Sequence, residues 1–160
     1  MCEEEFLQKK IIRRAMHLLE HMDRTEKGLR EKLRQSDYPE DMIEHAIAYV
    51  KSYGYIDDER YARNYIRYRL DHKTRQQLMQ ELYRKGVDRR IIQEAWEEIA
   101  EEEQPDERRL LRSLLLKKTQ GKKQLTKKEY QRLQGYLARK GFSWEDIASV
   151  IEEEKIELIY

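Results

Sequence analysis

A three-fold internal repeat constrains this chain more than any other feature of its sequence. In each copy two leucines lie four residues apart. A turn position follows four residues later, then an apolar residue, and then an isoleucine with an apolar pair behind it. The three copies, which match without a gap, are Leu29, Leu33, Asp37, Tyr38, Ile43, Ala46 and Ile47; Leu78, Leu82, Gly86, Val87, Ile92, Ala95 and Trp96; and Leu133, Leu137, Gly141, Phe142, Ile147, Val150 and Ile151. Repeats of this size are typical of stacked helical units.

Each copy predicts two helices joined by a short turn. Leucines at i and i+4 give the first helix one apolar face, and the second helix carries its apolar residues at a matching spacing. The turn position favours a residue with a left-handed backbone, a role that suits Gly86 and Gly141 and suits Asp37 less well. The apolar residue after the turn is expected to pack back on the preceding helix.

Threonines mark where the first helix of each pair begins. Thr74 with Gln77 and Thr126 with Glu129 have the spacing of a capping box, in which the threonine and the later side chain satisfy each other's backbone amides. Thr25 occupies the equivalent position in the first copy, where Gly28 removes the reciprocal half of the box.

A further helical segment precedes each pair, at about residues 6–22, 58–71 and 106–119, where apolar residues recur at helical spacing. The sequence therefore predicts an all-α fold of three tandem three-helix repeats forming an elongated, curved array. The predicted repeats span residues 1–56, 57–104 and 105–160. Residues 117–128 (KKTQGKKQLTKK) are the most loop-like stretch. Because about 50 residues build only a small core, we expect the repeats to lean on one another.

Charge is abundant and segregated along the chain. Charged residues make up 41% of the sequence, yet the net charge is only +1. Residues 60–90 carry a net +7 and residues 108–140 a net +11, whereas residues 1–59, 91–107 and 141–160 carry −4, −8 and −5. Such blocks predict a positive and a negative face on one molecule. The alternative is a solvated helical surface on which the blocks pair with each other.

Several classes of protein are excluded by composition. The longest apolar run, residues 46–50, is far shorter than the ~20 residues that span a membrane. The acidic start MCEEEF does not have the apolar core of a signal peptide. The single cysteine, Cys2, cannot form an internal disulfide, which fits a reducing cytosol, so we expect a cytoplasmic protein.

The junction between the first two repeats carries a recognisable motif. Residues 54–62 read GYIDDERYA, and residues 81–87 read ELYRKGV. These segments resemble the G-Y-[IL]-[DN]-D-x-x-[FY]-A signature and the EL-x-x-K-G-[IV] segment of the RecX family, bacterial regulators of the RecA recombinase. The resemblance extends over about residues 11–155 and includes the three-fold repeat.

The resemblance implies a function in DNA recombination, DNA repair and the SOS response. A protein of this family would bind along the groove of the RecA filament on single-stranded DNA and suppress ATP hydrolysis, strand exchange and filament growth. The implied partners are the RecA filament and single-stranded DNA, reached directly or through the filament. No membrane, enzyme activity or cofactor is implied, and we expect a monomer.

Basic residues of the second and third repeats are the candidate contacts with RecA or DNA, because phosphates require cationic donors. In the second repeat they are Arg63, Arg67, Arg69, Lys73, Arg75, Arg84, Lys85, Arg89 and Arg90. In the third they are Lys117, Lys118, Lys122, Lys123, Lys127 and Lys128. Tyr65 and Tyr68 lie among the former and could stack on bases, although such tyrosines are more often half-buried.

The family signature itself is interpreted as structural. Gly54 is expected to end a helix, and Asp57 or Asp58 to cap the next one. Tyr55, Ile56 and Tyr61 are expected to pack between repeats. The signature positions are Gly54, Tyr55, Ile56, Asp57, Asp58, Tyr61 and Ala62.

No pattern in the sequence indicates catalysis or metal binding. His17 and His21 lie four apart on a predicted helix, but no third ligand lies near them in the sequence. There is no glycine-rich phosphate loop and no nucleophile motif. Two other hypotheses remain open: a stand-alone nucleic-acid-binding helical module, favoured by the two basic blocks, and a helical scaffold for an unrelated protein, favoured by the acidic residues 91–107.

Overall fold

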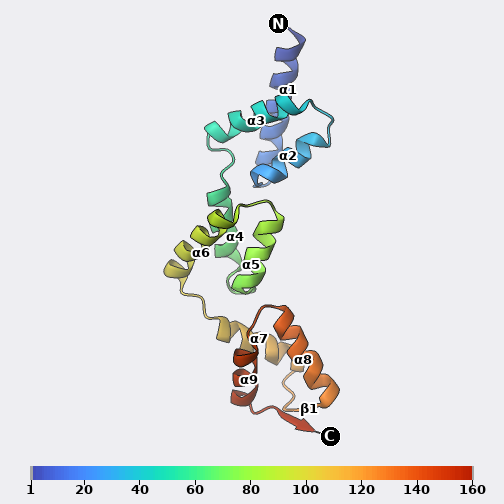
Figure 1. Ribbon diagram of the computed structural model, residues 1–160, viewed down its shortest axis with the longest axis vertical. Helices are drawn as coiled ribbons and strands as arrows, with labels where there is room; N and C mark the ends of the chain where they lie inside the picture. Colours follow the sequence, from blue (N-terminus) through green and yellow to red (C-terminus); the bar gives the residue numbers. More distant parts are fainter. Residues whose placement is uncertain (1, 160) are drawn as a thin grey trace. The chain divides into compact units, whose positions relative to one another are not determined.

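The computed structural model describes residues 2–159, which form nine helices and two short strands (Figure 1). The helices are α1 (Glu3–His21), α2 (Glu26–Arg34), α3 (Glu40–Ser52), α4 (Asp58–Arg69), α5 (Arg75–Arg84), α6 (Arg89–Glu103), α7 (Glu107–Thr119), α8 (Lys127–Arg139) and α9 (Trp144–Glu153). The strands are β1 (Gln124–Thr126) and β2 (Glu157–Ile159). Consecutive groups of three helices coincide with the three predicted repeats.

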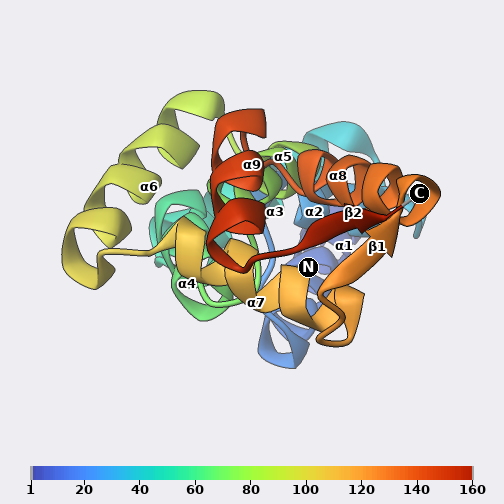
Figure 2. The same ribbon diagram turned by 90° about the horizontal axis from the view of Figure 1, so that it is seen from below.

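The predicted all-α fold is confirmed, and two short strands are added to it. β1 and β2 pair in parallel, with Leu125 opposite Leu158 (Figure 2). They correct the expected loop at residues 117–128, because α7 extends to Thr119 and only residues 120–123 lie outside regular structure before β1. Three-residue strands are too short to show an alternating pattern, and the partner strand is distant in the sequence.

The chain divides into two compact units. One contains residues 1–65 and 81–98, and the other contains residues 66–80 and 99–160. The first and third repeats therefore each lie in one unit, whereas the second repeat contributes to both.

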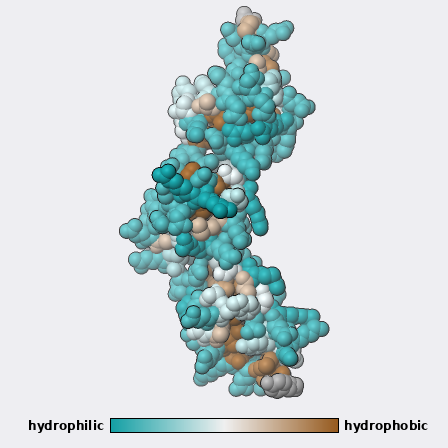
Figure 3. Space-filling model, viewed as in Figure 1, coloured by the Kyte–Doolittle hydropathy of each residue, from teal (hydrophilic) through white to brown (hydrophobic). Residues whose placement is uncertain are grey.

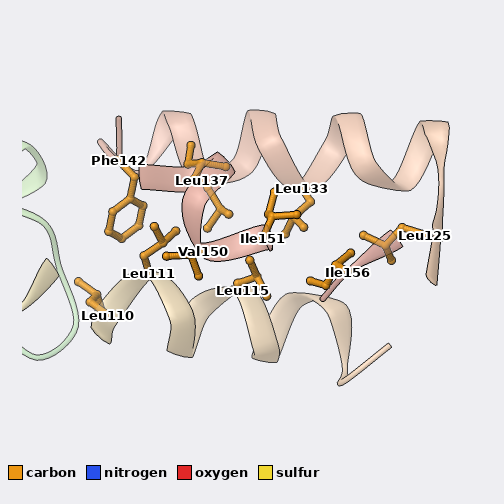
Figure 4. Packing of buried hydrophobic residues seen from close by; sticks show 11 residues of the cluster. Leu110, Leu111, Leu115, Leu125, Leu133, Leu137, Phe142, Val150, Ile151 and Ile156 are labelled. Carbon is orange, nitrogen blue, oxygen red and sulfur yellow. The ribbon is translucent and has the colours of Figure 1, made fainter. Parts of the chain in front are cut away.

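The predicted apolar positions are buried in all three repeats, except that Tyr38 is only partly buried. In the first repeat Leu29, Leu33 and Ile43 are fully buried in one cluster with residues of α1. In the third repeat the equivalent residues pack against leucines of α7, and Leu125 and Ile156 extend the cluster toward the strands (Figure 4). In the second repeat, Leu78 and Leu82 are also fully buried. The repeat in the sequence is thus a repeat of core positions.

The surface is as polar as the composition requires. Hydrophilic side chains cover most of the face seen in Figure 3. Among the helices of the described chain, none combines the length and the apolar character needed to cross a membrane.

The turn of each repeat has the left-handed residue that the sequence predicts. The φ angles are 57° at Asp37, 92° at Gly86 and 105° at Gly141. In the second repeat the amide of Val87 donates to the carbonyl of Leu82 at 3.1 Å, which closes the helix end in the manner of a Schellman motif. The same bond joins Phe142 to Leu137 at 3.3 Å.

Buried threonines join one repeat to the next. The Thr25 hydroxyl accepts the amide of Gly28 at the start of α2 and donates to the carbonyl of Lys85, in the turn of the second repeat, at 2.7 Å. The Thr74 hydroxyl accepts the amide of Gln77 and donates to the carbonyl of Lys140, in the turn of the third repeat, at 2.6 Å. We call these two contacts the threonine junctions; the first lies within one compact unit and the second within the other.

A carboxylate completes each threonine junction. The amide of Glu26, directly after Thr25, donates to Asp58 at 2.9 Å, and the amide of Arg75, directly after Thr74, donates to Glu107 at 2.7 Å. Asp58 and Glu107 are the first residues of α4 and α7, so both acceptors come from the start of the following repeat. Each carboxylate satisfies an amide that a helix cannot pair for itself.

The junctions explain the choice of residue at the turns. A Cβ atom on Gly86 would collide with the side chain of Lys27, and one on Gly141 would lie 2.8 Å from the Thr74 hydroxyl. Glycine is therefore required there by close approach as well as by its φ angle. Asp37 belongs to the first repeat, against whose turn no earlier repeat packs, and it is exposed.

The third capping threonine has different surroundings. Thr126 forms a complete capping box with Glu129 at the start of α8. It lies in β1, opposite Ile159 of β2, so its neighbour is a strand of the same repeat.

The threonine junctions predict unequal effects of one substitution at two sites. Thr74→Val should lower the free energy of unfolding by about 2–4 kcal/mol, because it removes a helix cap and leaves the Lys140 carbonyl buried without its partner. Thr126→Val removes only a cap and should lower it by about 1 kcal/mol. Urea denaturation followed by circular dichroism measures both, and equal losses would contradict the junction.

Candidate functional site

The arginines of α4 are paired with the acidic block of α6. Arg63 lies 3.8 Å from the carboxylate of Glu98, and Arg67 lies 3.1 Å from that of Glu102. The two arginines are four residues apart on α4, and the two glutamates are four residues apart on α6. Residues at this spacing share a helix face, so the arginine face of α4 lies toward the glutamate face of α6 at these positions. At these two positions the basic and acidic blocks pair with each other. This is the arrangement that the sequence leaves open as the alternative to separate positive and negative faces.

The turn between α5 and α6 presents a different arrangement of charge. The Arg89 guanidinium lies 4.7 Å above the ring of Tyr83, which is 53% exposed. Arg84 is exposed, and the structure records no hydrogen bond or ion pair for its side chain. Lys85 lies over the ring of Tyr65 at 5.7 Å, and Arg90 pairs with Glu94 at 3.1 Å. We call Tyr83, Arg84, Lys85, Arg89 and Arg90 the second-turn surface.

The start of α6 is unusual among the third helices of the repeats. α3 begins with Glu40 and Asp41, and α9 has Glu145 and Asp146 in its first turn, whereas the first turn of α6 contains no acidic residue and begins with Arg89 and Arg90. Acidic residues are favourable at this end of a helix because the macrodipole is positive there. The two arginines oppose that preference, and the acid at this end of the helix is instead Asp88, whose carboxylate accepts the amide of Arg90 at 2.9 Å.

Other candidates of the second repeat lie around the turn between α4 and α5. Arg69 is the last residue of α4, Lys73 lies in the turn and Arg75 begins α5. The backbone amide of Arg75 takes part in a threonine junction. Tyr65 is buried and donates its hydroxyl to Glu81 at 3.1 Å, whereas Tyr68 is 75% exposed.

The lysines of the third repeat are more ordered than the sequence predicted. Lys117 and Lys118 belong to the last turn of α7, and Lys118 lies 4.7 Å above the ring of Tyr136. Lys122 pairs with Glu129 at 3.8 Å, and the Lys123 ammonium donates to the carbonyl of Glu154 at 2.9 Å. Lys127 and Lys128, at the start of α8, are exposed.

The signature residues have mostly the structural roles expected of them. Gly54 has a φ of 73°, Ile56 is buried, and Ala62 is fully buried. Asp57 caps α4 by accepting the amides of Glu59 and Arg60 at 3.0 and 3.1 Å. Asp58, by contrast, faces α2 of the preceding repeat through its bond to the Glu26 amide, so the two aspartates cap different helices.

Tyr55 departs from its expected role. It was predicted to pack between repeats, but it is 45% exposed and stacks on Tyr53 with ring centroids 6.0 Å apart. Tyr53 in turn lies 4.9 Å from Tyr49. The close spacing of these three tyrosines in the sequence is the signal from which an exposed aromatic cluster could be predicted.

No arrangement for metal binding exists among residues 2–159. No group of three His, Cys, Asp or Glu side chains in this range could hold an ion, and His17 and His21 are both exposed. The free thiol of Cys2 is exposed as well.

The fold places the chain in the class of mostly helical proteins built from tandem three-helix repeats. Three consecutive helix–turn–helix repeats present basic and acidic surfaces. Within that class, the chain belongs to the RecX family. The family models of the first, second and third RecX three-helix domains match residues 12–49, 57–95 and 106–151, in that order. The family consists of regulatory proteins rather than enzymes.

Individual relatives support the assignment. The chain is 32% identical over 143 residues to the regulatory protein RecX of Clostridium acetobutylicum, covering 88% of this chain and 66% of that one. It is 35% identical over 142 residues to the regulatory protein RecX of Vibrio vulnificus, covering 88% and 90%. The chain therefore spans about two thirds of the clostridial relative and most of the Vibrio one.

Solved structures show the same fold. A crystal structure of RecX from Lactobacillus salivarius has a TM-score of 0.72 at 24% identity, covering 94% of this chain and 97% of that one. A second crystal structure, of a regulatory protein RecX, has a TM-score of 0.75 at 28% identity and covers 91% and 71%.

Asp58 predicts a pH-dependent stability. Burial raises the pKa of its carboxyl above the ordinary value, and the hydrogen bond from the Glu26 amide acts against that rise. Because the folded-state pKa is raised, the wild type should gain stability as the pH falls from the raised value toward that of a free Asp. Asp58→Asn keeps an acceptor for Glu26 without the charge.

Denaturation of the wild type and Asp58→Asn between pH 4 and pH 7 tests this prediction. The variant should be at least as stable as the wild type at pH 7, and its advantage should shrink as the pH falls. An advantage that grows on acidification would contradict the raised pKa. Asp58→Ala should be less stable than either at pH 7, because it removes the acceptor.

Proposed function

We propose that this chain binds the RecA filament on single-stranded DNA and inhibits its ATP hydrolysis, strand exchange and filament growth. The observation that carries the proposal is the match of all three RecX domain models, in order, to the three repeats. The fold supports it, since helix–turn–helix repeats give a protein without catalytic groups a broad contact surface.

The second-turn surface is the proposed contact with DNA phosphates. Within residues 2–159 no partner is recorded for the Arg84 side chain, and Arg89 contacts the ring of Tyr83 rather than a carboxylate, so both guanidinium groups keep donors for phosphate. Tyr83 offers an exposed face for a base beside these charges.

The other basic candidates have secondary roles in this proposal. Arg63 and Arg67 face Glu98 and Glu102, so charge reversal there would place like charges together and disturb the fold as well as any contact. The exposed Lys127 and Lys128 would add sequence-independent attraction, because a lysine is a point charge without the bidentate geometry of arginine.

The test of the main proposal is RecA-dependent ATP hydrolysis on single-stranded DNA. Adding this protein in excess over RecA should suppress hydrolysis and slow filament growth. Undiminished hydrolysis at excess protein would refute the proposal.

The alternative is a stand-alone nucleic-acid-binding module, which the free donors of Arg84 favour. It predicts tight binding to single-stranded DNA without RecA, with a log–log salt slope of about −0.7 per contacted phosphate. A helical scaffold for an unrelated protein is less well supported, because Glu98 and Glu102 of the acidic block already have partners within the chain.

A paired substitution tests the second-turn surface. Arg84→Ala with Arg89→Ala should raise the concentration needed for half inhibition about tenfold or more, since losing a charge-assisted contact costs about 1.5–3 kcal/mol. The matched control is Arg13→Ala with Arg14→Ala, two exposed arginines of α1 for which the structure records no side-chain partner. If both paired substitutions raise the half-inhibition concentration equally, the effect comes from net charge alone, and a specific contact at the second-turn surface is contradicted.

A further inference from the structure

Three exposed tyrosines form a cluster at the end of α3 and in the turn that follows. Tyr49, Tyr53 and Tyr55 are 40%, 62% and 45% exposed. The ring centroids of Tyr49 and Tyr53 are 4.9 Å apart, and those of Tyr53 and Tyr55 are 6.0 Å apart. Aromatic residues are enriched at protein interfaces, and exposed clusters of them mark interaction sites. The contacts proposed above for DNA and RecA do not use this cluster.

A cavity of about 460 Å³ lies beside the tyrosines. Gly54, between Tyr53 and Tyr55 in the chain, is part of its wall, and Ile56 and Ile91 supply apolar surface. The rest of the wall is acidic, with the carboxylates of Glu26, Asp57, Asp58, Glu59 and Asp88. All of these residues belong to the same compact unit. We call the cavity and the three tyrosines together the acid–tyrosine surface.

Carboxylates outnumber cations in the wall of the cavity itself, and Lys85, Arg89 and Arg90 flank the part of the wall that Gly86 and Asp88 form. Lys51 also lines the cavity, and its ammonium is 3.3 Å from the carboxylate of Glu26. Arg60 donates to the carbonyl of Gly54 at 2.9 Å. One lysine therefore faces five carboxylates in the wall.

The chemistry of the surface fits a cation with an apolar stem. An arginine or lysine side chain could place its charge among the carboxylates, lay its methylene groups on the isoleucines, and contact a tyrosine ring through a cation–π interaction. Arginine is the cation most often found in such contacts and at the centres of protein interfaces.

We propose that the acid–tyrosine surface docks a basic, arginine-bearing segment of a protein partner. The inference rests on the function proposed above, and the partner is therefore RecA itself within the filament. The chain would then use two surfaces of opposite charge, the second-turn surface for phosphate and the acid–tyrosine surface for protein.

The test variant combines Tyr53→Ala with Glu59→Gln. Tyr53 is the most exposed ring of the cluster, and the structure records no partner for the Glu59 carboxylate, so neither change removes a cap or a core residue. The matched control is Trp144→Ala with Glu145→Gln, an aromatic residue that is 62% exposed and a neighbouring carboxylate on α9. Both pairs remove one ring and one charge.

Three binding assays with the 160-residue chain separate the outcomes. The probes are RecA filaments formed on poly(dT) with a non-hydrolysable ATP analogue, poly(dT) alone, and a nona-arginine peptide. The test variant should bind the filament and the peptide at least about tenfold more weakly than the wild type, whereas the control should not, and binding to poly(dT) should be unchanged.

Unchanged binding of the test variant to both the filament and the peptide would overturn the inference. Weaker binding to poly(dT) would also overturn it, because the tyrosines would then be a platform for bases. If the wild type fails to bind the filament, the proposed function fails. A tenfold loss of peptide binding confined to the test variant would then still support a basic protein segment as the ligand of this surface.

Discussion

The structure depends on a threonine hydroxyl that forms two hydrogen bonds at once. In the first two repeats this hydroxyl accepts an amide at the start of its own helix and donates to a turn carbonyl of the next repeat. A repeat of about 50 residues buries too little apolar surface to be stable alone, so it needs a contact that also fixes the position of its neighbour. A buried polar group has to be paired, and the pairing available to Thr25 and Thr74 joins successive repeats.

The same geometry organises the charges. Arg63 pairs with Glu98 in one unit and Arg67 pairs with Glu102 in the other, so part of the segregated charge is paired inside the second repeat. What remains available lies at the turn between α5 and α6, where Arg84 and Arg89 are not opposed by carboxylates, and on the acidic wall beside Tyr53. A net charge of +1 therefore conceals two surfaces of opposite sign. Such a polarised molecule suits a partner made of protein and nucleic acid together.

The core could be predicted from the sequence because leucines at fixed spacing have one satisfactory arrangement on a helix. The capping box of Thr126 and the left-handed turns at Gly86 and Gly141 follow from equally local rules. The junctions could not be predicted, since the bond from Thr74 to Lys140 joins residues 66 positions apart. The strands could not be predicted either, because β1 and β2 are distant in the sequence. Among the site candidates, sequence reasoning found the basic residues but could not tell Arg63, which has a carboxylate partner, from Arg84, which has none.

The central claim is that successive repeats are held together at the threonine junctions, and amide hydrogen exchange of the intact chain tests it directly. The first amide of a helix ordinarily has no partner in that helix and exchanges readily. The amides of Glu26 and Arg75, the first residues of α2 and α5, donate to carboxylates of the next repeat. They should therefore exchange clearly more slowly than those of Glu40 and Trp144, which begin α3 and α9 and have no recorded acceptor. Equal rates at all four positions, after correction for local sequence, would contradict the account.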